Sequence, residues 1–196
     1  LRCLVGSEMC IRDRVDQGAI SITFGRFNPP TVGHESLINK VAREAKASGG
    51  EYRIYPSRTQ DPKKNPLDPS TKIKFMKQAY PEHANAIQSS EDMKTIFDVL
   101  TALDSEGYSS VNLVVGGDRV SEFNSLATKY NGKLYNFEDI KVTSAGDRDP
   151  DAEGVEGMSA SKLRKAAVED DFSAFDKGLP KDCLLYTSDA ADEWLR

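Results

Sequence analysis

Short apolar runs recur along the chain and alternate with stretches of helical spacing. Residues 19–24 alternate between apolar and polar side chains and are rich in β-branched and aromatic residues, which is typical of a strand. Residues 52–55 and 111–115 show the same preference, and 111–115 form the most continuous apolar run. Weaker runs at 86–88 and 140–142 predict two further strands. The pattern therefore predicts about five strands.

Apolar residues at helical spacing fill the intervals between these strands. They predict a first helix that begins near Thr31 and ends before Gly49. Asp68 or Ser70 is expected to cap a second helix, and residues 89–92 are expected to open a third. Later helices are predicted over residues 120–126, 159–168 and 172–175.

This alternation of strands and helices indicates an α/β fold. We predict a three-layer α/β/α domain in which helices cover both faces of a parallel sheet of about five strands. In such sheets ligands bind at the carboxyl ends of the strands, near the point where the strand order reverses. The loops that follow residues 24, 55 and 115 are expected to meet at that edge.

The bulk properties narrow the classes of partner. The chain has 196 residues, a formal net charge of −5 and a pI of about 5.2. A general nucleic-acid-binding surface would be basic, so we expect no nucleic-acid partner. No run reaches the roughly 18 apolar residues of a membrane span, and residues 1–10 lack the layout of a signal peptide. We expect a cytoplasmic protein without a membrane partner, and the oligomeric state stays open.

Both ends of the chain are expected to be foreign to the domain. Residues 9–13 can be encoded by a DNA string whose reverse complement encodes residues 183–187, as inverted copies of one sequencing adapter would be. We therefore predict one domain over residues 15–182, with residues 1–14 and 183–196 as non-native tails. All three cysteines lie in these tails, so thiol chemistry is not expected of the domain. Natural disordered tails are the alternative.

The turn after the first strand carries the strongest candidate chemistry. It reads Gly25-Arg26-Phe27-Asn28-Pro29-Pro30-Thr31-Val32-Gly33-His34. A helix that begins at Thr31 offers unpaired backbone N–H groups and a positive dipole end, which together hold a phosphate. Gly25 and Gly33 allow a close backbone approach, and His34 lies one turn into the helix on the side of Thr31. The open alternative is a capped helix start with an incidental histidine.

This turn resembles the signature of the nucleotidyltransferase superfamily, whose members carry His-x-Gly-His or Thr-x-Gly-His after the first strand. The second family element is a Ser/Thr-rich stretch with an arginine at the start of a late helix. A similar stretch follows much later in this chain and reads Met158-Ser159-Ala160-Ser161-Lys162-Leu163-Arg164. The resemblance covers most of residues 20–167 and implies a Rossmann-like fold. In motif it is closest to the nicotinamide mononucleotide and phosphopantetheine adenylyltransferases.

The resemblance implies transfer of a nucleoside monophosphate from a nucleoside triphosphate to a small phosphorylated acceptor, with release of pyrophosphate. Such sites work by positioning the reactants and neutralising phosphate charge. By resemblance, His34 stabilises the transition state, and Thr31 offers a hydroxyl in place of the family's first histidine. Ser159 and Ser161 would hold the β- and γ-phosphates, and Arg164 would clamp them with its planar fork.

Further nucleotide contacts are expected from the loops at the same edge. In the first loop these are Arg26, Phe27 and Asn28, although Arg26 could equally be an ordinary loop cation. Gly116 and Asp118 follow the strand at 111–115 and could contact ribose or base. A tight turn in which Asp118 caps the next helix explains those two residues nearly as well.

A lysine-containing loop offers a candidate for the acceptor side. Residues 60–67 resemble the loop that contributes a lysine to the acceptor phosphate in several adenylyltransferases. Lys64 is preferred over Lys63 as the catalytic cation, and a solvated basic loop is the alternative. The carboxylates of residues 147–156 lack metal-site spacing and are interpreted as a solvated lid or linker.

The identity of the nucleotide follows from a departure within the signature. Thr31 and the preceding Asn-Pro-Pro resemble adenylyltransferases more than cytidylyltransferases, which favours ATP over CTP. A Mg²⁺ ion is expected to bridge the phosphates and to be held by them and by water, with no protein ligand named. The alternatives are a CTP-dependent cytidylyltransferase of a head group or sugar phosphate, and a non-catalytic nucleotide-binding or regulatory protein on the same scaffold. A fragment of a class I aminoacyl-tRNA synthetase shares the helix-start signature, but this chain is too short for one.

Overall fold

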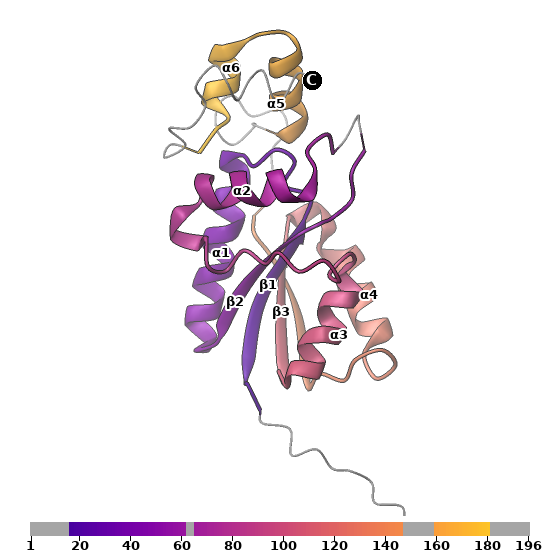
Figure 1. Cartoon of the computed structure of the whole chain (residues 1–196). Helices are drawn as coiled ribbons and strands as arrows, with labels where there is room; N and C mark the ends of the chain where they lie inside the picture. The colour runs from indigo at the N-terminus through magenta and orange to yellow at the C-terminus, as the bar shows by residue number, and fades with distance from the viewer. Residues whose placement is uncertain (1–15, 62–64, 147–158, 181–196) are drawn as a thin grey trace, which may run out of the picture.

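The computed structural model describes residues 16–61, 65–146 and 159–180, and its centre is one parallel sheet (Figure 1). The described strands are β1 (Ala19–Gly25), β2 (Glu51–Pro56), β3 (Ser110–Val115) and β4 (Asp139–Ser144). They are all parallel and lie in the order β2-β1-β3-β4. The α/β prediction is confirmed. The strand predicted at 86–88 is reduced to a single parallel bridge between Ile87 and Ile54, on the outer side of β2.

Helices cover both faces of the sheet, as the alternation of apolar residues requires. The helices α1 (Val32–Ser48) and α2 (Pro69–Ala79) lie on one face, and α3 (Ile96–Glu106) and α4 (Val120–Tyr130) lie on the other (Figure 1). Ile20 and Ile22 of β1 point into the core beneath α3 and α4. Ile54 of β2 points into the core beneath α1 and α2. Tyr55, the next residue of β2, points into the core beneath α3 and α4, so β2 contributes to both cores.

The remaining described elements are short and mostly lie near the ends of the sheet. The 3₁₀ turns η1 (Pro81–His83) and η2 (Gly117–Arg119) follow α2 and β3. The helices α5 (Ala160–Val168) and α6 (Phe172–Lys177) form a pair above the carboxyl ends of the strands (Figure 1). None of the described helices has the length and apolarity that crossing a membrane requires.

Local capping chemistry fixes the ends of the first two helices where the sequence predicts them. Thr31 is the N-cap of α1, and Gly49 ends that helix in the left-handed region with φ 68°. Asp68, rather than Ser70, caps α2, because its carboxylate accepts hydrogen bonds from the backbone N–H groups of Ser70 at 2.9 Å and Thr71 at 3.1 Å. Hydrogen bonds from the Ser70 and Thr71 hydroxyls, and then these backbone bonds, lower the pKa of Asp68.

The start of α3 differs from the prediction. Residues 89–92 were expected to open this helix, but it begins at Ile96. Thr95 and Asp98 form a reciprocal capping box, in which the Asp98 carboxylate accepts from the Thr95 N–H at 2.7 Å. The earlier polar stretch resembles a cap in composition, yet the first side chain that the helix buries is Ile96. Residues 89–92 consequently form a loop at the carboxyl edge of the sheet.

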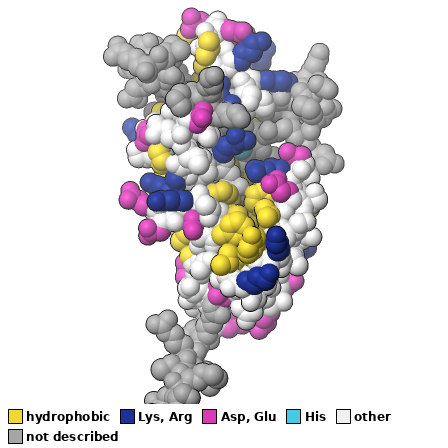
Figure 2. All heavy atoms as spheres, turned by 90° about the vertical axis from the view of Figure 1, so that its right-hand side faces the viewer, with side chains coloured by type: hydrophobic (Ala, Val, Ile, Leu, Met, Phe, Trp, Pro, Cys, Tyr) yellow, Lys and Arg dark blue, Asp and Glu magenta, His cyan; other side chains and the backbone are white. Residues whose placement is uncertain are grey.

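One surface of the α3–α4 side is markedly apolar. Figure 2 shows hydrophobic side chains gathered on this face, with lysines and arginines beside them. Partly buried hydrophobics on this side are Phe97 of α3, Val120 and Tyr130 of α4, and Met93 of the loop before α3. Phe97 and Tyr130 pack edge to face with ring centroids 4.9 Å apart, which joins α3 to α4.

The pairing of β1 with its two neighbouring strands ends at different positions. β1 remains paired with β2 as far as Gly25 and Pro56. Its pairing with β3 stops earlier, at Ile22 and Leu113. The strand order also reverses between β1 and β3, which is where parallel sheets bind ligands. The fold thus places the loops after β1 and β3 on either side of this switch point, where the rule for parallel sheets predicts a ligand-binding crevice.

Candidate active site

The loop after β1 is held in an unusual conformation by its own side chains. Phe27 has a positive φ of 46° and is buried, and its ring lies 4.9 Å from the His34 ring between centroids. A Cβ atom on Gly25 would lie 3.0 Å from the Phe27 ring, so only glycine fits there without displacing that ring. The Asn28–Pro29 peptide bond is cis. Gly25 and Phe27 therefore shape the loop, and their predicted contact with nucleotide stays a prediction.

The His34 ring is oriented by the residue that caps its helix. The backbone N–H of Thr31 donates to His34 Nδ1 at 3.1 Å, and the Thr31 hydroxyl lies 3.0 Å from the same nitrogen. Because Nδ1 accepts from a backbone N–H, the proton of the neutral ring is on Nε2. Thr31 is itself fully buried, and its carbonyl accepts from the Tyr80 hydroxyl at 2.8 Å. The Nε2 edge of His34 is therefore a hydrogen-bond donor at the start of α1.

The backbone donors at the start of α1 are not equivalent. The Val32 N–H donates to the Gly178 carbonyl at 3.1 Å, and the His34 N–H donates to the Thr31 carbonyl at 2.9 Å. No residue in the described part of the chain accepts from the Gly33 N–H. The anion site expected at this helix start stays a prediction, and of these three backbone donors the Gly33 N–H is the one that could serve it.

The late serine–arginine element reaches the first loop. Ser159 caps α5 and accepts from the Lys162 N–H at 3.2 Å. Arg164 donates from Nη1 to the Asn28 carbonyl at 2.5 Å, across 136 positions of sequence, and from Nη2 to Ser161 Oγ at 3.1 Å. The structure brings Ser159, Ser161 and Arg164 together at the loop that leads to His34.

The charge of a second guanidinium group, that of Arg26, acts on Arg164 at this junction. Burial, and then the charge of Arg26, lower the pKa of Arg164. Arg26 is exposed in the first loop. No ion pair between either arginine and a carboxylate occurs in the described residues. An anion bound between the two groups would relieve their repulsion, which favours a phosphate at this position.

Asn28 connects the first loop to the loop after β2. Its buried side-chain amide donates to the Leu67 carbonyl at 3.2 Å and accepts from the Leu67 N–H at 3.4 Å. The amide nitrogen and oxygen of the Asn28 side chain therefore already have protein partners. Contact of Asn28 with nucleotide stays a prediction, and it would have to be made by the backbone of this residue.

The turn after β3 does not have the capping role considered for Asp118. Asp118 lies inside η2, whose N-cap is Gly116, and the N-cap of α4 is Arg119. Neither position has a side-chain cap hydrogen bond, so the capping alternative is wrong. A Cβ atom on Gly116 would lie 2.8 Å from Asp118 Oδ1, and this close approach requires glycine unless the carboxylate moves. Contact of Gly116 and Asp118 with ribose or base stays a prediction.

The loop after β2 is fixed at both ends, although its lysines lie outside the described residues. Ser57 donates its N–H to the Gly25 carbonyl at 2.7 Å. Asp61 and Asn65, which flank residues 62–64, exchange two backbone hydrogen bonds of 3.0 and 2.8 Å. The prediction for Lys64, like that for the acidic residues 147–156 and for the two tails, therefore stays untested by the structure.

Sequence reasoning missed a buried lysine beneath this loop. Lys72 is in α2, only 1% exposed, and its ammonium donates to the Ser57 carbonyl. Burial, and then the charge of Arg58, lower the pKa of Lys72 to about 8. A lysine in a helix is ordinarily assigned to the solvated face, so only its register with Met76 and Ala79 could have indicated burial.

The described residues contain no group of three or more His, Cys, Asp or Glu side chains that could hold a metal ion. The donors at the crevice are instead N–H groups and guanidinium groups, which complement phosphate oxygens. This set fits a Mg²⁺ ion that arrives on the triphosphate and is held by phosphate and water.

Comparison with known proteins agrees with this geometry. The sequence profile of the cytidylyltransferase-like family matches residues 22–166. No curated protein gives a significant sequence match.

Two similar solved structures share the fold. One is from Vibrio parahaemolyticus and is assigned as a nicotinate-nucleotide adenylyltransferase; it is 17% identical, with a TM-score of 0.53, and the match covers 91% of this chain and 99% of that one. The other is the nicotinic acid mononucleotide adenylyltransferase of Plasmodium falciparum in complex with NaAD, which is 16% identical, with a TM-score of 0.58 and coverages of 85% and 93%. With the profile match over most of its length, the chain belongs to the cytidylyltransferase-like family of nucleotidyltransferases.

Proposed function

We propose that this chain is an adenylyltransferase that transfers AMP from ATP to a small phosphorylated acceptor. A phosphate oxygen of the acceptor attacks the α-phosphorus of ATP in line. The bond from that phosphorus to the oxygen bridging it to the β-phosphate breaks, and pyrophosphate leaves. No covalent protein intermediate is needed, since positioning and charge neutralisation supply the catalysis.

The observation that carries this proposal is the bond between Arg164 and the Asn28 carbonyl. It joins the late serine–arginine element to the loop that precedes His34, at 2.5 Å. A guanidinium group has five N–H donors. The bonds of Arg164 to the Asn28 carbonyl and to Ser161 Oγ use one donor on each terminal nitrogen. The remaining donors, with Arg26 close by, are available to the β- and γ-phosphates at the crevice.

His34 has the geometry of a donor to the reacting phosphate. The Thr31 N–H bond to Nδ1 fixes the tautomer of the neutral ring, so that Nε2 carries the proton. A donor of this kind stabilises charge that develops on the nonbridging oxygens during transfer. Thr31 then acts through its backbone N–H as much as through the hydroxyl that the sequence comparison singled out.

ATP and a nucleotide-like acceptor are favoured over the alternatives. Thr31 in place of the first histidine, and the Asn-Pro-Pro before it, resemble adenylyltransferases. The two similar structures are both described as adenylyltransferases of nicotinate nucleotides, which makes nicotinic acid mononucleotide the first acceptor to test. CTP-dependent transfer to a head-group or sugar phosphate is the second candidate, because the matching family profile is named for cytidylyltransferases.

The test is pyrophosphate release by the full chain with Mg²⁺. ATP and CTP are each combined with nicotinic acid mononucleotide, nicotinamide mononucleotide, phosphopantetheine and a head-group phosphate. We expect release with ATP and one acceptor, and only background release with CTP. Release with CTP alone would replace the proposal by the cytidylyltransferase. ATP binding without release for any acceptor would favour a non-catalytic nucleotide-binding protein.

A further inference from the structure

Lys72 is a charged residue in a position that usually holds an apolar one. It shares the buried face of α2 with Met76 and Ala79 and is 1% exposed. Its ammonium makes one described hydrogen bond, to the carbonyl of Ser57, and forms no ion pair in the described part of the chain, although the charge of Asp68 acts favourably on it. Burying an ammonium without a carboxylate is costly, so this lysine is a poor choice for stability alone.

The carbonyl that Lys72 holds begins the loop after β2. Ser57 is buried and is also bonded through its N–H to the Gly25 carbonyl at 2.7 Å. Its hydroxyl lies 3.3 Å from the Thr59 hydroxyl, and the Asn65 amide reaches Thr59 at 3.5 Å. The far end of the loop is held by Asn28 through Leu67. Lys72 therefore anchors a loop that is docked onto the first loop at both of its ends.

A second cation holds the same loop from the other side. Arg58 donates from Nη1 to the Ser89 and Ser90 carbonyls at 3.3 Å each and lies 3.7 Å from a Glu91 carboxylate oxygen. These residues belong to the loop at the carboxyl edge where a helix was expected. Arg58 thus has carbonyl and carboxylate partners, whereas Lys72 has the Ser57 carbonyl.

We infer that Lys72 is a positioning residue: its bond to the Ser57 carbonyl fixes the loop after β2 against the first loop, and so sets where the acceptor binds relative to the triphosphate. This inference rests on the proposed function for its consequence in catalysis. Its structural part, the anchoring of residues 57–61 and 65–67, stands independently of turnover. The lowered pKa of Lys72, which reflects its burial, agrees with an ammonium that is retained despite its cost.

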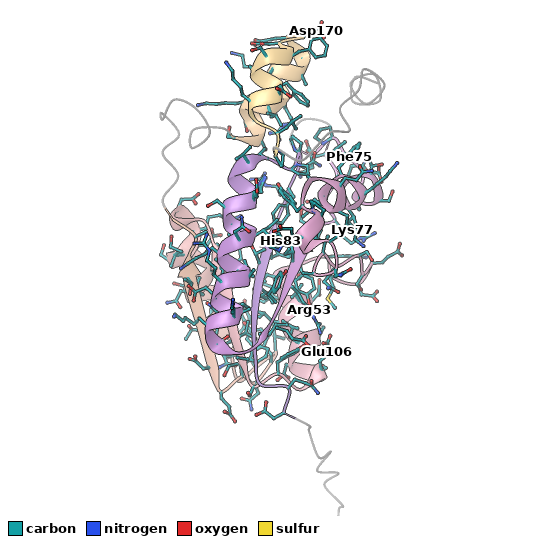
Figure 3. The ribbon with its side chains drawn as sticks, turned by 90° about the vertical axis from the view of Figure 1, so that its left-hand side faces the viewer. Arg53, Phe75, Lys77, His83, Glu106 and Asp170 are labelled. Atoms are coloured by element: carbon teal, nitrogen blue, oxygen red, sulfur yellow. The ribbon has the colours of Figure 1, made fainter. Side chains whose placement is uncertain are left out.

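The test compares Lys72→Met, Lys72→Arg and a control, Lys77→Met, in the full chain. Lys77 is an exposed lysine of the same helix (Figure 3). We expect amide hydrogen exchange in residues 57–61 and 65–67 to accelerate roughly tenfold in Lys72→Met, and the melting temperature to stay level or rise. Lys72→Arg should restore most of the protection, and Lys77→Met should match the wild type.

The kinetic readout separates positioning from general damage. For Lys72→Met we expect kcat/KM for the acceptor to fall roughly 10- to 100-fold, while the Kd for ATP changes by less than about threefold. Unchanged exchange in the loop, equal losses for acceptor and ATP, or a large fall in melting temperature would each overturn the inference. If the wild type itself turns over no acceptor, the proposed function fails, and the exchange data alone decide the role of Lys72.

Discussion

At the scale of single residues, the orientation of His34 is the most informative result. The sequence places a histidine one turn into a helix, but it does not say which ring nitrogen faces a ligand. The Thr31 backbone N–H bonds to Nδ1 and so leaves Nε2 as the donor. From spacing alone, a capped helix start and a histidine that acts on phosphate are alternative interpretations of this turn. The geometry is compatible with both at once.

We expect His34→Ala to lower kcat by roughly 100- to 1000-fold, as loss of one transition-state donor does, and to change the Kd for ATP by less than about fivefold. Thr31→Val, which keeps the backbone N–H to Nδ1, should lower kcat much less. Steady-state kinetics and calorimetric titration of ATP measure the two quantities. Equal losses of turnover and affinity in His34→Ala would contradict the role assigned to Nε2.

Some residues of the site could not be predicted from their own chemistry. Lys72 was missed because lysine is normally solvated, and its burial depends on the Ser57 carbonyl lying above α2. The Arg164–Asn28 bond depends on tertiary structure, since its partners are 136 positions apart. By contrast, the residues of both signature elements could be predicted from the sequence, because each element resembles a family motif and lies at a predicted helix start.

At the scale of elements, local sequence accounts for most of the fold. Thr31, Asp68 and Ser159 begin helices at the predicted positions, and Gly49 ends one. The predicted start of α3 was wrong because several residues before it could cap a helix. Burial of Ile96 in the core selects Thr95 as the N-cap. The strand predicted at 86–88 is only a single bridge in the structure. Its one described pairing partner is β2, through Ile87 and Ile54.

A buried histidine ties three of these elements together. His83 of η1 lies 3.0 Å from the Tyr52 hydroxyl of β2 through Nδ1, and 3.0 Å from Asn39 Oδ1 of α1 through Nε2. It lies between α1 and the sheet (Figure 3). Burial lowers the pKa of His83, against the smaller opposing effects of Glu82 and Glu35. The neutral ring is therefore the form that joins the elements.

This linkage predicts an acid-sensitive fold. Because the pKa of His83 is lower in the folded chain than its ordinary 6.5, the unfolded chain binds the proton more tightly. The stability contributed by the neutral ring is complete above about pH 6.5 and is lost as the pH falls below it. Urea unfolding should show a steeper loss of stability between about pH 7.5 and 5 for the wild type than for His83→Gln. Parallel pH profiles for the two proteins would refute this linkage.

At the scale of the whole molecule, the site is assembled from distant parts of the chain. The first loop, the loop after β2, the turn after β3 and the start of α5 all lie at the carboxyl edge of one parallel sheet (Figure 1). The parallel topology explains this convergence, since it brings every strand's exit to the same edge. The sequence predicted this gathering of loops, and the structure adds that the pairing of β1 with β3 ends before this edge.

The central claim is that the chain transfers a nucleoside monophosphate, and the position of an isotopic label tests it most directly. The full chain is incubated with Mg²⁺, nicotinic acid mononucleotide and ATP labelled at either the α- or the γ-phosphorus, with CTP labelled in the same way as a comparison. The account predicts that the α-label of ATP appears in the dinucleotide product and the γ-label in pyrophosphate. A γ-label that moves to the acceptor, or an α-label that stays in ATP with every acceptor tested, would contradict it.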